Sequence, residues 1–378
     1  MEQSIVTKCS VKANKNMISA QKAAKKYYKD KLFAKKNHET KAVIRKVVDL
    51  NLIGSKDLTT YSELSNLGMN QSFTRESLIQ LCESLRLTGR SGNGFLVADK
   101  LKAYKSQKGV LLINGVECDP GLIHDAWLYR NQLVKVQQGT EILQKAFGFQ
   151  EIILATKEPL REGVFKYKQI KIRDRFPMGY ENYLIKTVLG IQVPQGKRAA
   201  DMGILVMNIQ TVLAIAEAVN NRASAYTKWI TVADMRSAKA YAVKVELRKD
   251  VMALIKQVFP RESFSKKEIF VGGGALSCHE LKRDEVITDT TFFVAVGSMP
   301  DYSKAKNCAR CGKCSKNCPA GVDVLNIIQY IQKHGKENRG ACKVYHPERC
   351  ISCGACTYGC LAGKDVRGSV AWAKGENI

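Results

Sequence analysis

Short apolar runs alternate with longer segments of helical periodicity in the first half of the chain. The runs "GVLLING" (109–115) and "QEIILAT" (150–156) are bounded by turn residues, which is typical of buried strands. Residues 124–148 lie between them, have helical periodicity and end at a glycine. A strand, a helix and a strand at this spacing predict a βαβ unit. Residues 201–219 repeat the strand-then-helix order, so we predict an α/β domain over 41–225.

The pattern changes from about residue 226. The runs "WITVAD", "AYAVKVEL", "EIFVGGGAL" and "TTFFVAV" are short and β-rich, and one helix is predicted over 250–258. This pattern predicts a small α+β domain over 226–300. The last segment, 301–378, contains a helix in "VDVLNIIQYIQKHG", with Gly335 as its C-cap.

Residues 1–40 form a lysine-rich extension. Ala20, Ala24, Tyr28 and Leu32 recur at i, i+4 spacing, which predicts a helix with one weak apolar stripe. We expect this helix to pack against the body or a partner. No aromatic-and-glycine recognition pattern accompanies the lysines, so nucleic acid is not the favoured partner.

The chain has 378 residues, which is enough for two or three domains with their own cores. No apolar stretch approaches the roughly 20 residues that span a bilayer. The first residues contain no apolar region of a secretory signal. We therefore expect a cytoplasmic protein, in which the thirteen cysteines favour metal ligation over disulfides.

The formal net charge is +25, from 60 Lys and Arg against 35 Asp and Glu. Such an excess favours a polyanionic partner, which includes an acidic protein, nucleic acid or an anionic membrane face. Simple solubility in a lysine-rich proteome explains the charge equally well.

Two cysteine runs near the end of the chain have the spacing C-x2-C-x2-C-x3-C. Three thiolates two residues apart can wrap one face of an iron–sulfur cube, and the fourth reaches the other cube. Two structural zinc sites are the alternative, but zinc needs only cysteine pairs. We predict two [4Fe-4S] clusters, the first held by Cys308, Cys311, Cys314 and Cys360, the second by Cys350, Cys353, Cys356 and Cys318.

Five cysteines lie outside these runs. A free cysteine usually behaves as a small buried hydrophobe, and we predict this role for each of them. They are Cys9, Cys82, Cys118, Cys278 and Cys342.

Two further segments have the chemistry of a ligand site. The glycine-rich "LTGRSGNGF" (87–95) precedes a predicted helix, so its backbone N–H groups could approach a phosphate. Its order differs from the dinucleotide G-x-G-x-x-G, so it predicts no Rossmann nicotinamide site. In "INGVECDPGLIHD" (113–125), polar side chains follow a strand, where open α/β sheets bind ligands. A capped turn into the next helix explains this segment equally well.

The glycine loop, the acidic turn, the β-rich domain and the paired cysteine runs occur in the same order in the C subunit of the Rnf electron-transport complex. The chain resembles that protein, and its soluble relatives such as cobalamin reductase and the electron-transfer protein of proline reductase, over residues 75–365. The N-terminal half resembles the NADH- and FMN-binding flavoprotein subunit of respiratory complex I.

Individual positions carry this resemblance. The family's loop G-x-G-G-A-G-F-P is matched from Gly89 to Leu96, with departures at Ser91, Asn93 and Leu96. The family's acidic turn N-x-x-E-x-[DE]-P is matched in full. The matched positions of the turn, of "RFPMGYENYLI" and of "VMNIQTV" are Asn114, Glu117, Asp119 and Pro120, then Pro177, Gly179 and Glu181, then Asn208 and Thr211.

The resemblance implies a fold in three parts: an α/β flavoprotein-like domain, a β-grasp-like α+β domain, and a bacterial-ferredoxin-like domain with two clusters. In that family the matched elements bind FMN and present it to NADH. The implied FMN-binding residues are Gly89, Gly92, Gly94, Phe95, Lys100, Asn114, Glu117, Asp119, Glu181, Asn208 and Thr211.

The sequence therefore predicts an electron-transfer flavo-iron–sulfur protein that links NADH, through FMN, to a partner redox protein. Hydride transfer to a flavin needs no catalytic acid or base, and none is predicted. We expect a subunit of a larger complex that is cytoplasmic or peripheral to a membrane through its partners. The alternatives are a flavin-free relay subunit and, less favoured, a nucleic-acid-binding protein. An acidic ferredoxin, flavodoxin or reductase subunit would be steered by Arg310, Lys313, Lys316, Lys343 and Arg349.

Overall fold

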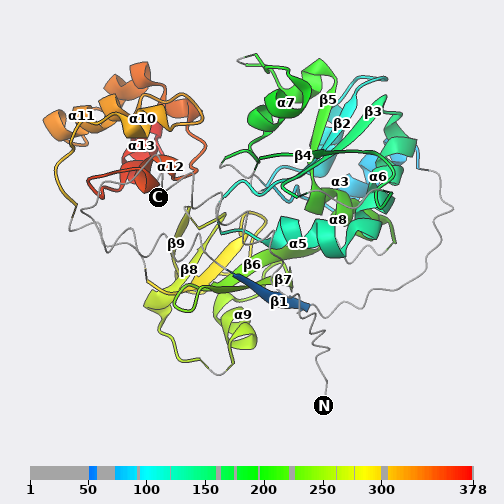
Figure 1. The fold of residues 1–378 in the computed structure, drawn as a ribbon, viewed down its shortest axis with the longest axis horizontal. Helices are drawn as coiled ribbons and strands as arrows, with labels where there is room; N and C mark the ends of the chain where they lie inside the picture. The colour runs from blue at the N-terminus through cyan, green and yellow to red at the C-terminus, as the bar shows by residue number, and fades with distance from the viewer. Residues whose placement is uncertain are drawn as a thin grey trace.

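The computed structural model describes residues 51–57, 73–91, 94–119, 121–158, 163–173, 177–194, 196–220, 226–260, 262–275, 277–298 and 305–376. The predicted helix within 1–40 lies outside these residues, as do Gly92 and Pro120. In Figure 1 two sheets lie on the right and below, and the C-terminal segment, in orange and red, lies on the left.

The first sheet has four parallel strands in the order β4-β3-β2-β5. Its strands are β2 (Val110–Gly115), β3 (Glu151–Thr156), β4 (Lys168–Lys171) and β5 (Ile204–Asn208). The predicted βαβ unit is confirmed, because β2 and β3 pair in parallel and helices connect them. The other helices of this part are α3 (Arg75–Ser84), α4 (Val97–Ala103), α7 (Glu181–Leu189) and α8 (Ile209–Asn220).

The prediction of a single helix over 124–148 is wrong, because the structure has two helices there. The structure divides it at Gln132, whose φ of −122° leaves the helical region, into α5 (His124–Asn131) and α6 (Leu133–Phe147). The break lets the two halves pack differently: α5 contacts strands of both sheets, whereas α6 packs mainly along α8. Neither Gly nor Pro marks this position, so periodicity alone could not reveal it.

The second sheet is mixed and six-stranded, in the order β1-β7-β6-β10-β8-β9. The strands predicted after residue 226 are present as β6 (Thr227–Asp234), β7 (Lys239–Glu246), β8 (Ile269–Gly272) and β10 (Phe293–Val296), joined by β9 (Cys278–Glu280). Helix α9 (Val251–Val258) packs its buried residues against this sheet. One strand comes from far upstream, because β1 (Asn51–Asp57) pairs in parallel with β7.

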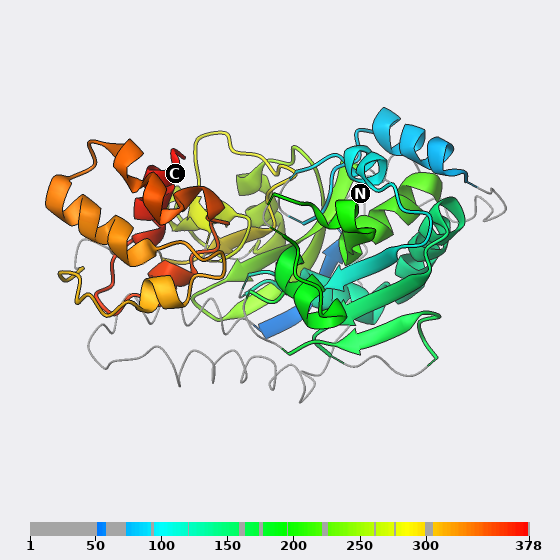
Figure 2. The same cartoon turned by 90° about the horizontal axis from the view of Figure 1, so that it is seen from above.

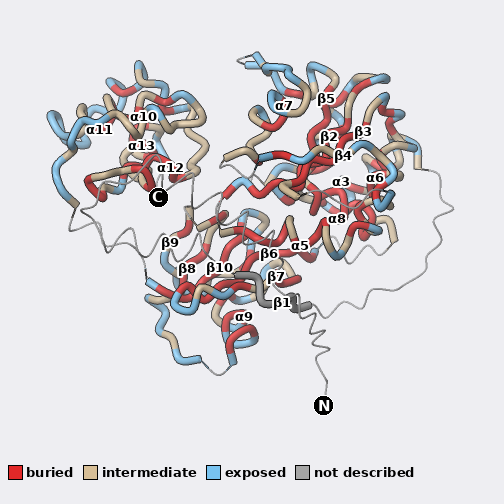
Figure 3. The backbone as a smooth tube through the Cα atoms, in the orientation of Figure 1, coloured by how far each residue is buried: buried red, intermediate tan, exposed pale blue. Residues whose placement is uncertain are grey.

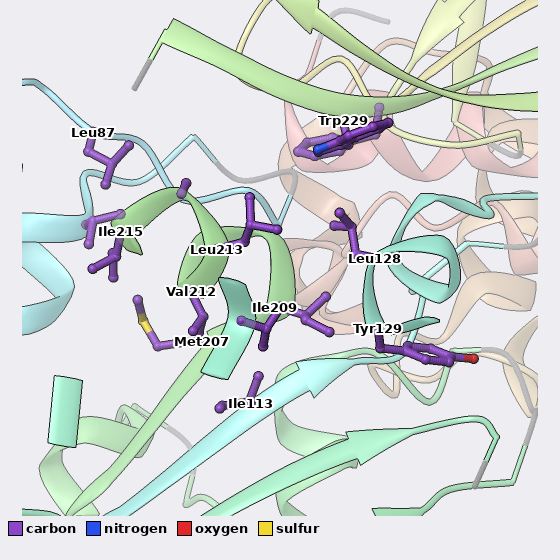
Figure 4. Packing of buried hydrophobic residues seen from close by; sticks show 14 of the residues in the cluster. Leu87, Ile113, Leu128, Tyr129, Met207, Ile209, Val212, Leu213, Ile215 and Trp229 are labelled. Atoms are coloured by element: carbon purple, nitrogen blue, oxygen red, sulfur yellow. The ribbon is translucent and has the colours of Figure 1, made fainter. Parts of the chain in front are cut away.

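One apolar core joins the two sheets, and buried residues concentrate there in Figure 3. The rings of Trp127 on α5 and Trp229 on β6 lie 4.3 Å apart. Figure 4 shows Trp229 of the second sheet above Leu128 on α5 and Leu213 on α8. Aromatic pairs of this kind contribute about 0.5–1.5 kcal/mol beyond their buried area. The α/β part and the second sheet are therefore held as one packed body.

The C-terminal segment has a separate small core and, in Figure 2, lies beside the second sheet. It contains α10 (Lys313–Lys316), α11 (Val324–His334), α12 (Ala355–Tyr358) and α13 (Val366–Lys374), and α11 ends at Gly335 as predicted. Its core includes Ile327 and Val370, which lie on the two longer helices. Across the described residues, no helix is both long enough and apolar enough to cross a membrane.

Candidate functional site

The two cysteine runs adopt the same backbone conformation. Arg310 and Ser352 occupy equivalent positions between the first two cysteines of their runs, and both have positive φ, 49° and 54°. Gly312 and Gly354 follow the second cysteines and cap the short helices α10 and α12, again with positive φ. Backbone strain is thus accepted at matching points, which is expected where a loop is wrapped around a fixed shape.

The repeat extends into the helices behind the runs. The side chain of Ser315 accepts a hydrogen bond from the backbone N–H of Leu325 at 2.7 Å, and Thr357 accepts one from Arg367 at the same distance. Asp323 and Asp365 cap α11 and α13 in the same way. Each cysteine turn is therefore hydrogen-bonded to the start of the longer helix that follows it.

The first predicted set of thiols encloses a cavity. Cys308, Cys311, Cys314 and Cys360 all line it, together with apolar and glycine residues from both runs. Burial raises the pKa of Cys314 to about 11, and the thiols of the other three cysteines add to the rise. The fourth cysteine of the second run thus joins the first three of the first run, as the sequence predicts.

The second predicted set is gathered in the same way. Burial raises the pKa of Cys353 to about 12, and the thiols of Cys318 and Cys350 contribute. The pKa of Cys356 is also raised by burial, with contributions from these same three residues. Cys318, from the first run, is therefore grouped with the second run.

The chemistry of both groups fits iron–sulfur clusters. Their donor atoms are thiols only, and backbone N–H groups point at sulfur: Val322 donates to Cys318 Sγ and Ser352 to Cys350 Sγ, each at 3.4 Å. Such N–H···S contacts tune a bound cluster. Within the described part of the chain, no three His, Cys, Asp or Glu side chains are gathered tightly enough for one metal ion.

The cysteines outside the runs differ in burial. Cys82, Cys278 and Cys342 are buried, as predicted. The prediction is wrong for Cys118, which is exposed because it lies in the turn after β2 rather than in a core. Cys9 lies outside the described residues.

The carboxyl edge of the first sheet gathers several of the predicted flavin residues. Asn208 ends β5, and its register partner Asn114 is the last residue but one of the neighbouring β2. The Asn114 amide donates to the carbonyl of Gly179 at 2.8 Å, and the Asn208 amide donates to Asp125 at 2.8 Å. These strand ends meet where open parallel sheets bind ligands.

The acidic turn supplies buried carboxylates to this edge. Glu117 accepts a hydrogen bond from the backbone N–H of Ala126 at 2.7 Å and lies 3.1 Å from Lys157 Nζ. Burial, assisted by the Glu117 charge, raises the pKa of Asp125 to about 8. Glu117 therefore accepts a hydrogen bond from the start of α5 and also places a carboxylate near the strand ends. A capped turn and a ligand site are thus compatible explanations of this segment.

The glycine loop closes on itself. The N–H of Gly89 donates to the carbonyl of Phe95 at 2.7 Å, and Gly94 has a φ of 64° that favours glycine. The Arg90 N–H donates to Thr211 Oγ1 at 2.8 Å. Loop and α8 are thus joined near the start of that helix, whereas the Phe95 ring is 68% exposed.

Lys100 and Glu181 form an ion pair of 2.8 Å at a partly exposed position. Glu181 begins α7, and Gly179 precedes it. A Cβ atom at Gly179 would lie 2.2 Å from the carbonyl oxygen of Val116, so only glycine allows this close approach to the acidic turn. The segment before α7 and the turn after β2 are therefore packed backbone to backbone.

Asp119 is placed differently from the other predicted residues. Its side chain packs directly on the second sheet's loop, where a Cβ at Gly274 would lie 2.3 Å from Asp119 Cγ. Burial chiefly raises the pKa of Cys353, and the Asp119 charge adds to that rise.

The sequence does not signal the contacts of Arg90, of Lys157 with Glu117, or of the Tyr183 hydroxyl with the carbonyl of Pro319. The Arg90 guanidinium is buried and donates to Thr88, to Asp289 and to the carbonyl of Thr227. It therefore points into the junction of the two sheets and not into the loop's mouth. No spacing rule signals the contacts with Asp289 and Thr227, because these residues lie far from Arg90 in the sequence.

The chain is similar to known oxidoreductase subunits. Residues 82–217 match the family model described as the Nuo51 FMN-binding domain. The C subunit of an ion-translocating oxidoreductase complex of Vibrio cholerae is 29% identical over 279 residues, covering 70% of this chain and 35% of that protein. The C subunit of a Na⁺-translocating ferredoxin:NAD⁺ oxidoreductase complex of Acetobacterium woodii is 24% identical, covering 71% and 63%.

Solved structures show the same fold. A chain of the NAD⁺-reducing [NiFe]-hydrogenase in its air-oxidised state matches with a TM-score of 0.56 at 15% identity, covering 84% of this chain and 65% of that one. The H₂-reduced state gives 0.54 at 14% identity. The chain spans about a third of the length of the Vibrio relative. These matches confirm the resemblance to the C subunits of Rnf-type ion-translocating oxidoreductase complexes, with an α/β part like the Nuo51 FMN-binding domain.

Proposed function

We propose that this chain is an electron-transfer subunit that links NADH, through FMN, to a partner redox protein by way of two [4Fe-4S] clusters. The observation that carries the proposal is the sorting of eight cysteines into two groups, each combining three thiols of one run with the last thiol of the other. This exchange of the fourth ligand is typical of two-cluster ferredoxins.

The FMN part rests on the match of residues 82–217 and on the chemistry of the strand ends. Bound FMN would accept a hydride and release electrons singly, which is the chemistry that this cofactor supplies. Loop 89–95 would offer backbone N–H groups to the phosphate, and Lys100 would add a positive charge. Asn114 and Asn208 would orient the flavin from the strand ends, with Gly179 keeping the two backbone segments close.

The proposed use of NADH is supported by the activities for which similar proteins are named. The Acetobacterium relative is named for oxidoreduction of ferredoxin and NAD⁺, and the hydrogenase of similar fold is NAD⁺-reducing. We infer that NADH or NAD⁺ is the two-electron partner of this chain as well. The exposed ring of Phe95 on the loop would be available to contact it.

We propose that the chain works inside a multi-subunit assembly, cytoplasmic or peripheral to a membrane. Proteins similar to it are named as subunits of ion-translocating complexes. The net charge of +25 suits an acidic redox partner. Arg310, Lys316 and Lys343 are exposed beside the cysteine turns, where they would steer such a partner.

A flavin-free relay subunit is the second candidate. Two observations favour it. Asn114, Glu117 and Asn208 already form hydrogen bonds within the chain, and the loop departs from the family at Ser91, Asn93 and Leu96. Such a chain would keep both clusters and the fold but would receive electrons from another subunit.

Cofactor content separates the two candidates. Protein purified anaerobically should contain about eight irons, eight sulfides and one FMN per chain. Cys353→Ser should lose one cluster, whereas the matched variant Cys342→Ser should keep both, because Cys342 is buried outside either group. Eight irons without flavin would favour the relay, and fewer than four irons would contradict both candidates.

A further inference from the structure

A short turn of the second sheet contacts the glycine loop. This turn, residues 288–291, lies between β9 and β10, and we call it the Asp289 turn. Its own hydrogen bonds close it: the N–H of Thr288 donates to Thr291 Oγ1 at 3.1 Å, and the N–H of Thr291 donates to the carbonyl of Thr288 at 3.1 Å. Both bonds join residues within the turn, so its shape is set locally.

Lys228 on β6 holds the Asp289 turn against the second sheet. This side chain is buried, and its ammonium group donates to the carbonyls of Asp289 at 2.8 Å and of Thr288 at 3.3 Å. A buried ammonium group is costly to leave without acceptors, so these carbonyls stay beside it. The turn is therefore fixed to β6, which is an inner strand of the sheet.

The Asp289 carboxylate reaches from this turn to the glycine loop. One of its oxygens accepts hydrogen bonds from the Thr88 hydroxyl and from Arg90 Nη1, the latter at 3.1 Å. Arg90 Nη1 also donates to Thr88 Oγ1 at 2.8 Å, so the three side chains form one network. Charge-assisted hydrogen bonds are stronger than neutral ones, which makes this network a strong link between loop and turn.

The loop is also held on its other side and closed across its base. The backbone N–H of Arg90 donates to Thr211 Oγ1 near the start of α8. Thr88 and Leu96 form an isolated β-bridge, and a Cβ atom at Gly94 would lie 3.6 Å from Thr290 Cγ2 of the turn. The turn therefore faces both arms of the loop. A loop that is ordered before its ligand arrives loses less freedom on binding.

Resting on the proposed function, we propose that the Asp289 turn fixes the shape of the glycine loop, and that Asp289 and Thr88 are positioning residues for FMN. They act through the loop backbone and not on the reacting atoms. The match to the FMN-binding domain ends at residue 217, well before the Asp289 turn. The second sheet thus contributes to the FMN affinity of the α/β part from outside the matched domain.

The test is a titration of the full chain with FMN after its flavin has been removed, followed by flavin fluorescence. Thr88→Val should weaken FMN binding about fivefold and Asp289→Ala about tenfold, because each removes hydrogen bonds that order the loop. The controls are Thr187→Val, whose side chain is exposed on α7, and Asp284→Asn, whose carboxylate is 86% exposed. Both controls should bind FMN as wild type does. Iron content and the unfolding midpoint are measured for each variant, so that only folded chains with their clusters are compared.

A double variant separates positioning through one network from two unrelated losses. Thr88 and Asp289 share a hydrogen bond, so their effects should not multiply. We expect the Thr88→Val, Asp289→Ala chain to bind FMN about tenfold more weakly than wild type, and not about fiftyfold. Wild-type affinity in either single variant, or effects that multiply, would overturn the proposal.

Hydrogen exchange of the flavin-free chain tests the loop itself. The amides of residues 87–96 should exchange faster in Thr88→Val and in Asp289→Ala than in wild type, whereas Thr187→Val should leave their exchange unchanged. Equal exchange in all four chains would contradict a loop that is held by the turn. Wild type without FMN affinity would end the proposed function and the FMN part of this proposal, while the exchange rates still decide whether the turn holds the loop.

Discussion

At the scale of single residues, the junction between the two sheets depends on a guanidinium group in the glycine loop. Arg90 is 1% exposed, and burial lowers its pKa while the Asp289 carboxylate opposes that change. Lys228 lies in the same junction, 3.4 Å from the centre of the Phe292 ring, and donates to the carbonyl of Asp289 at 2.8 Å. Two buried basic side chains therefore share the loop that carries Asp289, so each is costly to leave without its contacts.

Arg90→Ala should lower the free energy of unfolding by about 2–4 kcal/mol, because the loop loses its hydrogen bonds to the second sheet. Guanidinium unfolding followed by tryptophan fluorescence measures this loss. Arg283→Ala is the control, since that side chain is 91% exposed. Equal stability of the two variants would show that the buried contacts of Arg90 do not hold the loop in place.

Asp125 gives stability a specific pH dependence. Its pKa is raised from 3.8 to about 8, chiefly by burial and then by Glu117. The folded chain thus binds a proton that the unfolded chain has lost, and the free energy of unfolding falls as pH rises from about 4 to 8. Above pH 8 the effect levels off.

Asp125→Asn should flatten the pH profile of unfolding between about pH 6 and 8, where wild type loses at most about 1.4 kcal/mol per pH unit from this group. Denaturant unfolding at several pH values measures the slope. Asp284→Asn, with an exposed carboxylate, should keep the wild-type slope. An unchanged slope in Asp125→Asn would mean that this carboxyl is ionised in the folded chain.

Residue roles divide into those that the sequence could predict and those that it could not. Cysteine spacing alone predicts that Cys360 groups with the first run and Cys318 with the second, because a cluster would fix which thiols can meet. The side-chain directions of Arg90 and Asp119 are not predicted by spacing, because their partners lie on a sheet formed by residues far along the chain.

At the scale of elements, most strands followed from short apolar runs, since buried parallel strands need apolar residues on both faces. The unpredicted features are those decided by tertiary packing: the break at Gln132, the pairing of β1 with β7, and the short β4 and β9. The repeated cysteine turns were predictable as motifs. Their matching left-handed residues were not, because Arg310 and Ser352 rarely adopt positive φ.

Gly179→Ala tests how closely the segment before α7 must approach the acidic turn. The new methyl group would lie 2.2 Å from the carbonyl of Val116, so the two segments must separate. We expect FMN affinity to fall at least tenfold, measured by flavin fluorescence, with iron content unchanged. Gly340→Ala is the control, because its Cβ would meet only the side chain of Asn338, at 3.3 Å. Retained flavin affinity in Gly179→Ala would place the flavin site elsewhere.

At the scale of the whole molecule, two packed sheets form one body, and the C-terminal segment has its own core beside it. The order of the parts follows the proposed path of the electrons, from the α/β part to the cysteine groups. Cys311 is exposed, and so are the neighbouring basic residues Arg310 and Lys316.

Electron transfer to an acidic ferredoxin should slow as ionic strength rises, because salt screens attraction between exposed charges beyond about 10 Å at 0.1 M. Lys316→Glu, next to the first cysteine group, should lower the second-order rate constant at low salt. Lys256→Glu on α9 changes the net charge equally but lies on the second sheet's helix, so it should have a smaller effect. Rates independent of salt would argue against an electrostatically steered partner.

The most direct test of the account is anaerobic stopped-flow absorbance of the full chain mixed with NADH. We expect flavin absorbance to bleach first and the broad absorbance of both clusters to decrease afterwards, as electrons from the same NADH reach them. Flavin bleaching without any reduction of the clusters would contradict the wire between the two parts. Clusters that accept electrons from dithionite but never from NADH, in a chain without flavin, would make this protein a relay that another subunit supplies.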